Sequence, residues 1–266
     1  MYIRQITSSR NEKVKRWRKL GTRKGREEYG SILIEGEHLL EEAFTAGWTI
    51  HAVLVSEEGQ EVLRRFQGIR DVPVYSLPTA VFAQLVDTQS PQGIAAEVAV
   101  PRASEYRPSG SARLLLLDAI QDPGNLGAIM RTAEAAGVEE VWLGSGTVDP
   151  YNPKVVRSAM GSLFRLRLRR VHLKRAIPEL KRKGFTIVST EPRAEQAHFA
   201  VTYPKRTAVL LGNEGRGVSE ELAKLADLRV RIPMPGKAES LNVSVTAGIL
   251  LFEMVRQVWE TEKGVC

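Results

Sequence analysis

Three stretches in the C-terminal half of the chain combine glycine or proline with polar side chains in patterns that suit ligand binding and catalysis. The first, DAIQDPGNLGAIMRTAEAAGV, spans residues 118–138. A Pro-Gly turn follows an apolar strand there, and Asn125 occupies the position expected of a helix N-cap. The start of that helix would attract an anion, which the guanidinium of Arg131 could clamp. Simple capping by Asn125 and a solvated Arg131 are the plainer interpretation when this stretch is taken alone.

The second stretch, LLGNEGRGVSEEL, is a glycine-rich loop at residues 210–222. Gly212, Gly215 and Gly217 would let the backbone approach a ligand closely. The loop lacks the GxGxxG spacing of a dinucleotide site and the Gly-Lys-Ser/Thr of a phosphate-binding P-loop. Neither class of nucleotide site is therefore predicted, and Glu214 is either a ligand contact or a turn residue.

The third stretch, RIPMPGKAESLNVSVTAG, spans residues 231–248. Two prolines end a strand, a glycine permits a sharp bend, and Ser240 and Asn242 precede the last helix. Either side chain could cap that helix, and the pattern does not require both to do so. One of them is therefore a candidate for chemistry.

Strand-like and helical patterns alternate along the whole chain, which predicts an α/β fold that positions these loops. The apolar runs before residue 101 predict strands at 31–36, 50–56, 72–76 and 93–100. Those after residue 113 predict parallel strands at 114–120, 141–144, 163–169, 185–190, 207–212 and 229–233. A long amphipathic helix is predicted at 243–260. The Pro-, Ser- and Gly-rich stretch between the two series predicts a domain at 1–102, a linker at 103–112 and a domain at 113–266.

Positive charge is concentrated at the N-terminus. Residues 1–30 carry a net charge of +7, which equals the net charge of the whole chain. Clustered Lys and Arg suit a partner that offers phosphates, although a solvated basic helix or a disordered tail would look the same. We predict a helical leader between Ser8 and Arg26, with RNA contacts from Arg10, Lys13, Lys15, Arg16, Arg18, Lys19, Arg23, Lys24 and Arg26.

A second basic cluster, between residues 165 and 183, strengthens the case for nucleic acid. In FRLRLRR (164–170) arginines alternate with apolar residues, which predicts a strand with a basic face. No wide apolar face accompanies the charge, so an anionic membrane surface is less well supported.

The composition excludes several classes of protein. The single cysteine, Cys266, excludes a disulfide framework and favours a cytoplasmic protein. No secretory signal and no membrane span is predicted. No metal is expected, because the apolar content is sufficient for a core that needs no metal to stabilise it.

Together the three stretches resemble the SpoU branch of the SPOUT methyltransferases, also called the TrmH family. The match spans roughly residues 113–260 and departs from the family only in minor ways, such as Thr246 where alanine is usual. It rests on Asn125, Arg131-Thr132-Ala133, Gly212-Asn213-Glu214, Gly217, Ile232-Pro233-Met234, Gly236 and Ser240-Leu241-Asn242-Val243.

The resemblance implies a C-terminal parallel-sheet SPOUT domain threaded into a trefoil knot, and a homodimer with its active site near the subunit interface. The N-terminal hundred residues resemble the L30e-like α/β domain often fused to this family, with a role in substrate binding. That second resemblance rests on the basic leader and on the segments LIEGEHLLEEA (33–43) and PQGIAAEV (91–98).

The resemblance also implies S-adenosylmethionine as methyl donor and a ribose 2′-hydroxyl of RNA as acceptor. The expected substrate is 23S ribosomal RNA, with a guanosine as one candidate target. The cofactor would be bound by Leu211, Gly212, Asn213, Gly217, Ile232, Met234 and Leu241. The catalytic residues would be Asn125, Arg131, Glu214, Ser240 and Asn242.

The group that accepts the hydroxyl proton is the open question of mechanism. All four histidines lie outside the three stretches, so a histidine base is not predicted. Neutralising an arginine side chain near pH 7 costs on the order of 8 kcal/mol. We therefore expect Arg131 to polarise and position the hydroxyl rather than to take its proton.

Three alternatives remain at this stage. The same chemistry could act on transfer RNA, but the extra N-terminal domain favours ribosomal RNA. The chain could be a non-catalytic RNA-binding assembly factor, which the retained polar residues disfavour. A methylase that confers antibiotic resistance on the ribosome has the same sequence features.

Overall fold

The computed structural model describes residues 3–65, 71–101, 106, 108 and 110–262. The chain forms two compact units, unit 1 with Met1–Arg102 and Asp149–Phe164, and unit 2 with Ala103–Val148 and Arg165–Cys266. The sequence-based division differs from these units in one segment, Asp149–Phe164, which we call the inserted segment. The predicted linker at 103–112 lies partly outside the described residues.

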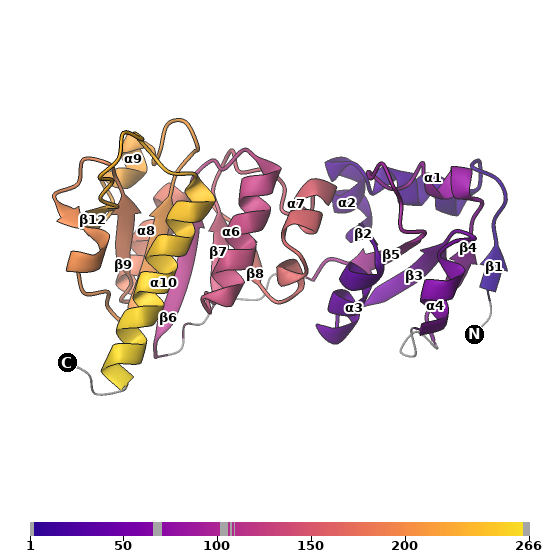
Figure 1. Cartoon of the computed structure of the whole chain (residues 1–266), viewed down its shortest axis with the longest axis horizontal. Coiled ribbons are helices and arrows are strands. Elements are labelled where there is room, and N and C mark those ends of the chain that lie inside the picture. The colour runs from indigo at the N-terminus through magenta and orange to yellow at the C-terminus, as the bar shows by residue number, and fades with distance from the viewer. Residues whose placement is uncertain (1–2, 66–70, 102–105, 107, 109, 263–266) are drawn as a thin grey trace. The chain divides into compact units, whose positions relative to one another are not determined.

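Unit 1 is built on a five-stranded mixed sheet in the order β1-β4-β3-β5-β2. Its strands are β1 (Ile3–Gln5), β2 (Ser31–Glu35), β3 (Ile50–Val55), β4 (Val74–Ser76) and β5 (Ile94–Ala99). Its helices are α1 (Glu12–Lys19), α2 (Arg23–Tyr29), α3 (Glu37–Thr45), α4 (Gln60–Arg65), α5 (Thr79–Phe82), α7 (Pro153–Ser158) and the 3-10 turn η1 (Ser162–Phe164). Within this unit, α1 and α2 lie on one side of the sheet and α3 and α4 on the other (Figure 1).

The basic leader is an integral part of unit 1, as the helical prediction required. Asn11 caps α1 by accepting a hydrogen bond from the Lys13 backbone N–H at 2.9 Å. The apolar face of α1 places Val14 and Trp17 in the core beside strand residues such as Leu54. A disordered tail is thereby excluded, because burial of this face stabilises the unit.

Unit 2 contains a seven-stranded sheet in the order β10-β12-β9-β11-β6-β7-β8, and every pairing in it is parallel. Its strands are β6 (Ala112–Leu117), β7 (Glu140–Leu143), β8 (Arg167–Arg170), β9 (Thr186–Thr190), β10 (Gln196–Ala197), β11 (Arg206–Leu211) and β12 (Leu228–Arg231). Its helices are α6 (Pro123–Ala135), α8 (Leu173–Arg182), α9 (Glu220–Ala223), α10 (Val243–Glu262) and the 3-10 turn η2 (His198–Ala200). The predicted α/β class and C-terminal parallel sheet are confirmed, and the trefoil knot stays a prediction.

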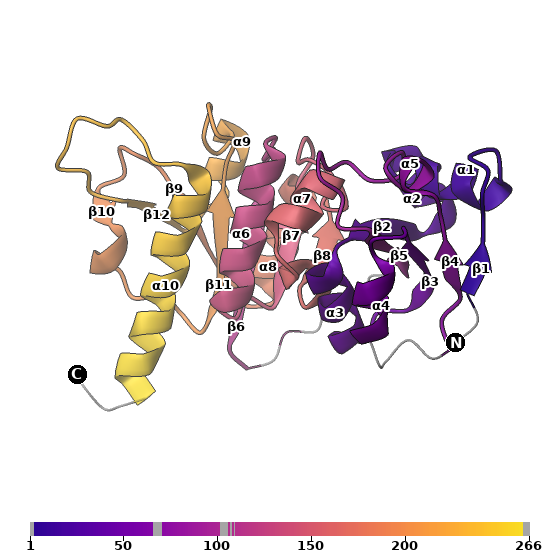
Figure 2. The ribbon, with the colours of Figure 1, turned by 45° about the vertical axis from the view of Figure 1, so that its right-hand side comes forward.

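Helices cover both faces of this sheet. Both ribbon views show α6 and α10 side by side on one face and α8 on the other (Figures 1 and 2). Leu114 and Leu116 of β6 pack in one cluster with Ile177 and Leu180 of α8. Side chains alternate along a strand, so the other leucines of β6 are buried on the opposite face, as a central parallel strand requires.

The strand order decides where loops can meet. Strand β11 lies between β9 and β6, and β12 lies on the far side of β9. Because the strands are parallel, the loops that follow β6, β9, β11 and β12 all leave the same edge of the sheet. Ligands bind at such an edge in open α/β sheets.

The strand predicted at 163–169 is wrong in its first half. Residues Ser162–Phe164 form η1, and β8 begins only at Arg167. Leu163 and Phe164 are consecutive and both buried, which does not fit a strand with only one buried face.

Part of the second basic cluster is neutralised within unit 2. Arg165 pairs with Glu134 at 2.9 Å, and Arg169 pairs with the buried Glu140 at 3.2 Å. The acidic partners come from distant parts of the chain, and further pairs join Lys174 to Glu221 and Lys181 to Asp227. This cluster is therefore a weaker candidate for binding phosphates than its sequence suggests.

Candidate active site

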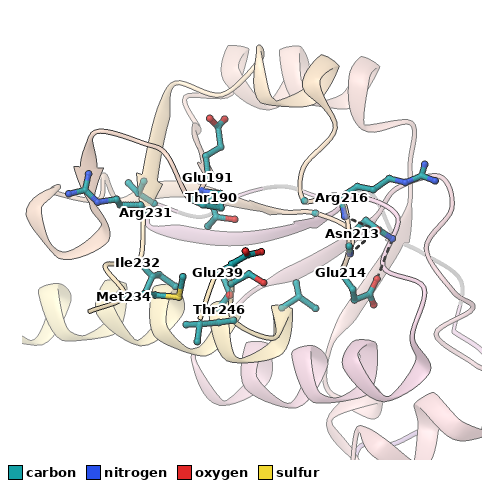
Figure 3. Close-up of a pocket in the computed structure, with 18 residues that line it drawn as sticks. Thr190, Glu191, Asn213, Glu214, Arg216, Arg231, Ile232, Met234, Glu239 and Thr246 are labelled. Carbon is teal, nitrogen blue, oxygen red and sulfur yellow. Dashed lines mark hydrogen bonds between the residues drawn. The ribbon is translucent and has the colours of Figure 1, made fainter. Parts of the chain in front are cut away.

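A cavity of about 290 Å³ lies in unit 2 where the loops after β9, β11 and β12 meet the start of α10 (Figure 3). It lies at the edge where the parallel strands end. Six of the seven predicted cofactor residues line it: Gly212, Asn213, Gly217, Ile232, Met234 and Leu241. The seventh, Leu211, is 1% exposed and belongs to the core of β11, so its side chain is not available to a ligand.

The loop after β11 is shaped by glycine. Asn213 and Gly217 exchange two backbone hydrogen bonds of 2.9 Å, which closes the loop on itself. A Cβ atom at Gly212 would lie 2.0 Å from the backbone of Gly217 and Val218. Gly212 is therefore required because any side chain there would collide with the backbone of the same loop. The sequence had instead suggested glycine for the close approach of a ligand.

The side chain of Asn213 fixes this loop from inside. Its Oδ1 accepts hydrogen bonds from the backbone N–H groups of Gly215 and Arg216, at 3.0 and 3.2 Å. Its Nδ2 donates to the carbonyl oxygen of Ala119 at 2.9 Å. Ala119 follows β6 and has a φ of 56°, a left-handed conformation that is unusual for alanine. Asn213 thus joins the glycine-rich loop to the turn that leads into α6.

Glu214 completes that junction. Its carboxylate accepts hydrogen bonds from the backbone N–H groups of Gln121 and Asp122, at 3.2 and 3.0 Å. It also accepts one from the Asn125 side-chain amide at 3.2 Å. Burial works to raise the pKa of Glu214, but the hydrogen bonds outweigh it and lower that pKa below its ordinary value. Glu214 is therefore an ionised acceptor at neutral pH and a poor candidate for a base.

The predicted capping role of Asn125 is wrong. Asp122 caps α6, because its Oδ1 accepts a hydrogen bond from the Asn125 backbone N–H at 2.8 Å. Asn125 itself lies in the first turn, and its Oδ1 accepts a hydrogen bond from the Asn242 amide at 2.9 Å. The Asn125 side chain is therefore free to link Glu214 to Asn242, which is a role in the site rather than in helix capping.

Asn242 caps the last helix. Its Oδ1 accepts hydrogen bonds from the Ser244 backbone N–H at 2.8 Å and from the Ser244 hydroxyl at 2.6 Å. Of the two side chains that the sequence offered for this role, Asn242 takes it and still bonds Asn125. Ser240 lines the cavity and is exposed. Glu214, Asn125 and Asn242 thus form one hydrogen-bonded chain, which we call the polar chain, beside the cavity.

Arg131 stands apart from this arrangement. It is exposed on α6, six residues after Asn125, and does not line the cavity. The helical repeat places it on a different face from Asn125. Among the residues that the structure describes, none makes a hydrogen bond or ion pair with its side chain. The structure therefore leaves its guanidinium available to a ligand or partner without showing which.

Several residues of the cavity wall were missed by sequence analysis, among them Thr190, Arg231, Glu239 and Thr246. The first two end strands β9 and β12, so the shared edge of a parallel sheet was the one signal that could have found them. Figure 3 shows Met234, Glu239 and Thr246 over the centre of the cavity, whereas the guanidinium of Arg231 points away from it. The cavity wall thus combines apolar side chains, the carboxylates of Glu191, Glu214 and Glu239, and loop backbone.

The predicted RNA-binding residues divide into two groups. Arg26 is 6% exposed, and its guanidinium donates to Asp149 of the inserted segment at 2.5 Å and to the Leu20 carbonyl at 2.9 Å. Arg26 is thus a structural residue, and its prediction as an RNA contact conflicts with this burial. Arg16 is half-buried and paired with Glu97. The side chains exposed on the surface are those of Arg10, Lys13, Lys15, Arg18, Lys19, Arg23 and Lys24.

Comparison with known proteins identifies the family. The model of the SpoU rRNA Methylase family matches residues 112–252, and that of an MRM3-like substrate binding domain matches residues 11–96. The chain belongs to the SpoU rRNA Methylase family. The family resemblance inferred from the three stretches is thereby confirmed, and so is the presence of a separate N-terminal domain.

Individual relatives match over nearly the whole chain. A Bacillus subtilis protein, 23S rRNA (guanosine(2553)-2′-O)-methyltransferase RlmP, is 39% identical over 95% of this chain and 99% of its own length. The 23S rRNA (guanosine-2′-O-)-methyltransferase RlmB of Xylella fastidiosa is 36% identical over 85% of this chain and 92% of its own. The crystal structure of an AdoMet-bound rRNA methyltransferase from Sinorhizobium meliloti superposes with a TM-score of 0.85 at 31% identity, covering 96% and 98% of the two chains.

Two further features bear on cofactors and location. No helix of the described residues is long and apolar enough to cross a bilayer. Within the same residues, no group of three or more His, Cys, Asp or Glu side chains is placed to hold a metal ion.

Proposed function

We propose that this chain transfers the methyl group of S-adenosylmethionine to a ribose 2′-hydroxyl of 23S ribosomal RNA. The loops that follow β11 and β12 meet around one cavity, and the polar chain Glu214–Asn125–Asn242 lies beside it. This is the observation that supports the proposal most directly. The names of the two curated relatives support both the reaction and the RNA, and guanosine is their common target.

The cavity fits the methyl donor. Ile232, Met234 and Leu241 offer an apolar surface, and the closed loop from Gly212 to Gly217 presents backbone polar groups. Most small-molecule sites combine an apolar lining with a few fixed polar groups in this way. When bound, S-adenosylmethionine supplies an electrophilic methyl group. Leu211 would contribute through its backbone alone, because its side chain is in the core.

The polar residues hold the acceptor. Methyl transfer requires the 2′-oxygen to lie in line with the bond that breaks, so fixed orientation is the main contribution of the protein. Asn125 and Asn242 are held by each other and by Glu214, and Ser240 adds a hydroxyl at the cavity. The lowered pKa of Glu214 keeps it an acceptor that orients Asn125. Arg131, which does not line the cavity of its own chain, polarises and positions the hydroxyl from a second copy of the chain. The hydroxyl proton passes to water as the methyl group is transferred.

A homodimer is the proposed assembly. Three exposed apolar side chains recur every seven residues on α10, namely Val245, Phe252 and Trp259, with exposures of 50%, 48% and 60%. That spacing places them on one face of the helix. An apolar stripe of this kind favours burial against another surface, and in the proposed dimer that surface is a second copy of the chain.

RNA is the proposed partner and the cytoplasm the proposed location; no metal is part of the proposed mechanism. The exposed cations of the leader support RNA binding, and the single cysteine suits a reducing compartment. The substrate-binding domain favours ribosomal over transfer RNA.

One experiment tests reaction and substrate together. Tritiated S-adenosylmethionine and purified chain are incubated with 23S ribosomal RNA from cells that lack the protein, and 2′-O-methyl sites are mapped with and without it. We expect one new site, at a guanosine. Label on transfer RNA alone would show that the substrate is transfer RNA and not 23S ribosomal RNA. Binding of RNA without transfer of label would favour an assembly role. No heat of binding with S-adenosylmethionine, alone or with RNA, would overturn the proposal.

A further inference from the structure

Unit 1 contains a cavity of its own, with a volume of about 330 Å³. Its wall is drawn from five segments of that unit: residues 18–21 of the leader, strand β2, helix α3, residues 84–87 after α5, and the inserted segment. Small-molecule sites begin at about this volume. The function proposed above makes no use of this cavity.

The floor of the cavity is apolar. Ile34, Leu39, Leu85 and Val156 line it and are all less than 9% exposed. A flat apolar or aromatic group placed there would cover the small apolar area that these side chains still expose. Nucleobases that are unstacked from their neighbours have such faces.

The rim is polar and carries two arginines. Arg18 donates to the side-chain oxygen of Gln84 at 2.6 Å, across the exposed mouth. Arg157 reaches Asp87 at only 3.4 Å, and the Asp87 side chain is 74% exposed. An ion pair of this length and exposure contributes little, so Arg157 can turn to another anion at small cost. Two guanidiniums at one rim suit a phosphate.

The carboxylate of Glu35 and the amide of Asn152 supply further polar groups on the wall. Glu35 is held in place, since it accepts hydrogen bonds from the Thr88 hydroxyl at 2.7 Å and from the Gln92 backbone N–H at 3.1 Å. A fixed acceptor beside an apolar floor can meet the N–H groups on the edge of a base. The wall therefore combines the three kinds of contact that a nucleotide needs.

The inserted segment gives this wall its rigidity. The pair between Arg26 and Asp149 is nearly buried, with side-chain exposures of 6% and 14%. It fixes the start of the segment to the leader, and α7 then carries Val156 and Arg157 into the cavity wall. The segment is therefore part of a preformed site rather than a loose connection.

We propose that this cavity binds one unpaired nucleotide of the RNA substrate, with its base on the apolar floor and its phosphate between Arg18 and Arg157. The proposal rests on RNA being the substrate of the chain, as proposed above. It adds a second anchoring point for the RNA, in a unit that holds none of the catalytic residues. Proteins that recognise RNA by sequence mostly bind such splayed-out nucleotides.

The first test measures binding of 5′-GMP to the full-length chain by calorimetry. S-adenosylhomocysteine is kept at saturation, so that the nucleotide cannot enter the methyl-donor cavity. We expect weak binding that Arg18→Ala and Arg157→Ala each reduce about tenfold, because each removes a charge-assisted hydrogen bond to the phosphate. Guanosine, which lacks the phosphate, should bind both variants as it binds the natural chain. Arg64→Ala, an exposed arginine of α4 outside the cavity, is the matched control and should change nothing.

The second test uses RNA. The Arg18→Ala/Arg157→Ala double variant should raise the KM for ribosomal RNA at least tenfold, while kcat and S-adenosylmethionine affinity stay unchanged. Ultraviolet cross-linking of the complex should attach a nucleotide to peptides from residues 84–87 or 152–157. If 5′-GMP does not bind, or binds both arginine variants as tightly as the natural chain, the proposal is overturned while the proposed function stands. If 5′-GMP binds as expected but no methyl group reaches any RNA, the proposed function fails and the cavity remains a nucleotide site.

Discussion

The motif loops of unit 2 and the basic leader of unit 1 were both conspicuous in sequence. The structure brings the predicted residues of the loops together, but it buries or pairs some of those in the leader. Six of the seven predicted cofactor residues come to one cavity, and Asn125 and Asn242 meet directly. In the leader, Arg26 is buried and Arg16 is paired, so these two cations are not free on the surface as the prediction required. Loop geometry follows from glycine, proline and asparagine close in sequence. The fate of a cation depends on partners that lie far along the chain.

The largest effect is expected at Gly212. An added Cβ would lie 2.0 Å from loop backbone, so Gly212→Ala must open the Asn213–Gly217 bridge. We expect a loss of more than about 3 kcal/mol in unfolding free energy and no detectable S-adenosylmethionine binding. Gly215→Ala in the same loop, where an added Cβ meets only ordinary van der Waals neighbours, should keep the stability within about 0.5 kcal/mol. Equal effects of the two variants in chemical denaturation would show that the loop is not shaped as described.

Substitution of Arg131 tests whether a cation of unit 2 acts in catalysis, whereas the cations of the leader act in RNA binding. Loss of an oriented group that acts in the transition state typically lowers the rate about 100-fold or more. We expect Arg131→Lys to lower kcat by about that factor with RNA and S-adenosylmethionine affinities intact, because lysine lacks the planar fork. Near-normal turnover by the lysine variant in a tritium-transfer assay would exclude a required guanidinium.

Arg26 and Arg23 separate structural from surface cations within one helix. Removing one partner of a buried ion pair costs about 3–5 kcal/mol, because it leaves the other charge uncompensated. Arg26→Ala, which removes the nearly buried guanidinium from Asp149, should therefore lower the denaturation midpoint of unit 1 markedly. Arg23 forms an exposed pair with Glu27 on the same helix, and Arg23→Ala should cost only about 0.3–0.5 kcal/mol. A stable Arg26→Ala variant with weakened RNA binding would restore Arg26 as an RNA contact.

Sequence predicted the elements of this fold better than their grouping. The run Leu114–Leu117 is apolar on both faces, which predicts a central parallel strand, and β6 is one. Strand β1 was missed, because it has only three residues and pairs with β4, which is distant in sequence. The membership of the inserted segment was also out of reach, since the pair that fixes it joins residues 123 positions apart.

In the candidate site, too, local features were predicted from sequence and features that depend on distant residues were not. Residue types at fixed spacing identified the two loops that meet, since turn chemistry is local. They gave the wrong cap for α6, because Asp122 and Asn125 are both good capping residues and only the backbone decides between them. Thr190 and Arg231 were missed because nothing local marks a strand end as part of a site; only the order of strands does.

A smaller effect is expected when exposed cations of the leader are compared with paired cations of unit 2. Lys13 and Lys24 are exposed in the leader, whereas Lys174 and Lys181 pair with Glu221 and Asp227. Removing one cation that binds a phosphate lowers the slope of log affinity against log salt by about 0.7–0.9. Lys13→Gln/Lys24→Gln should therefore lower the slope for RNA by about 1.5, and Lys174→Gln/Lys181→Gln should lower it by less. These variants are preferable to deleting the leader, which would remove core residues. The reverse order in filter binding would assign the RNA to unit 2.

The smallest effect concerns the pH dependence of the polar chain. The pKa of Glu214 is lowered in the folded protein from its ordinary 4.5, so its carboxylate stabilises the folded state above pH 4.5. This contribution disappears as the pH falls through the lowered pKa. Glu214→Gln should thus be less stable than the natural chain at pH 7, and the two should converge below pH 4.5. The gap is small, because the carboxylate is exposed and only part of its hydrogen bonding depends on charge. A gap that widens towards acid would mean that the pKa of Glu214 is raised in the folded chain, which would contradict its role as an ionised hydrogen-bond acceptor.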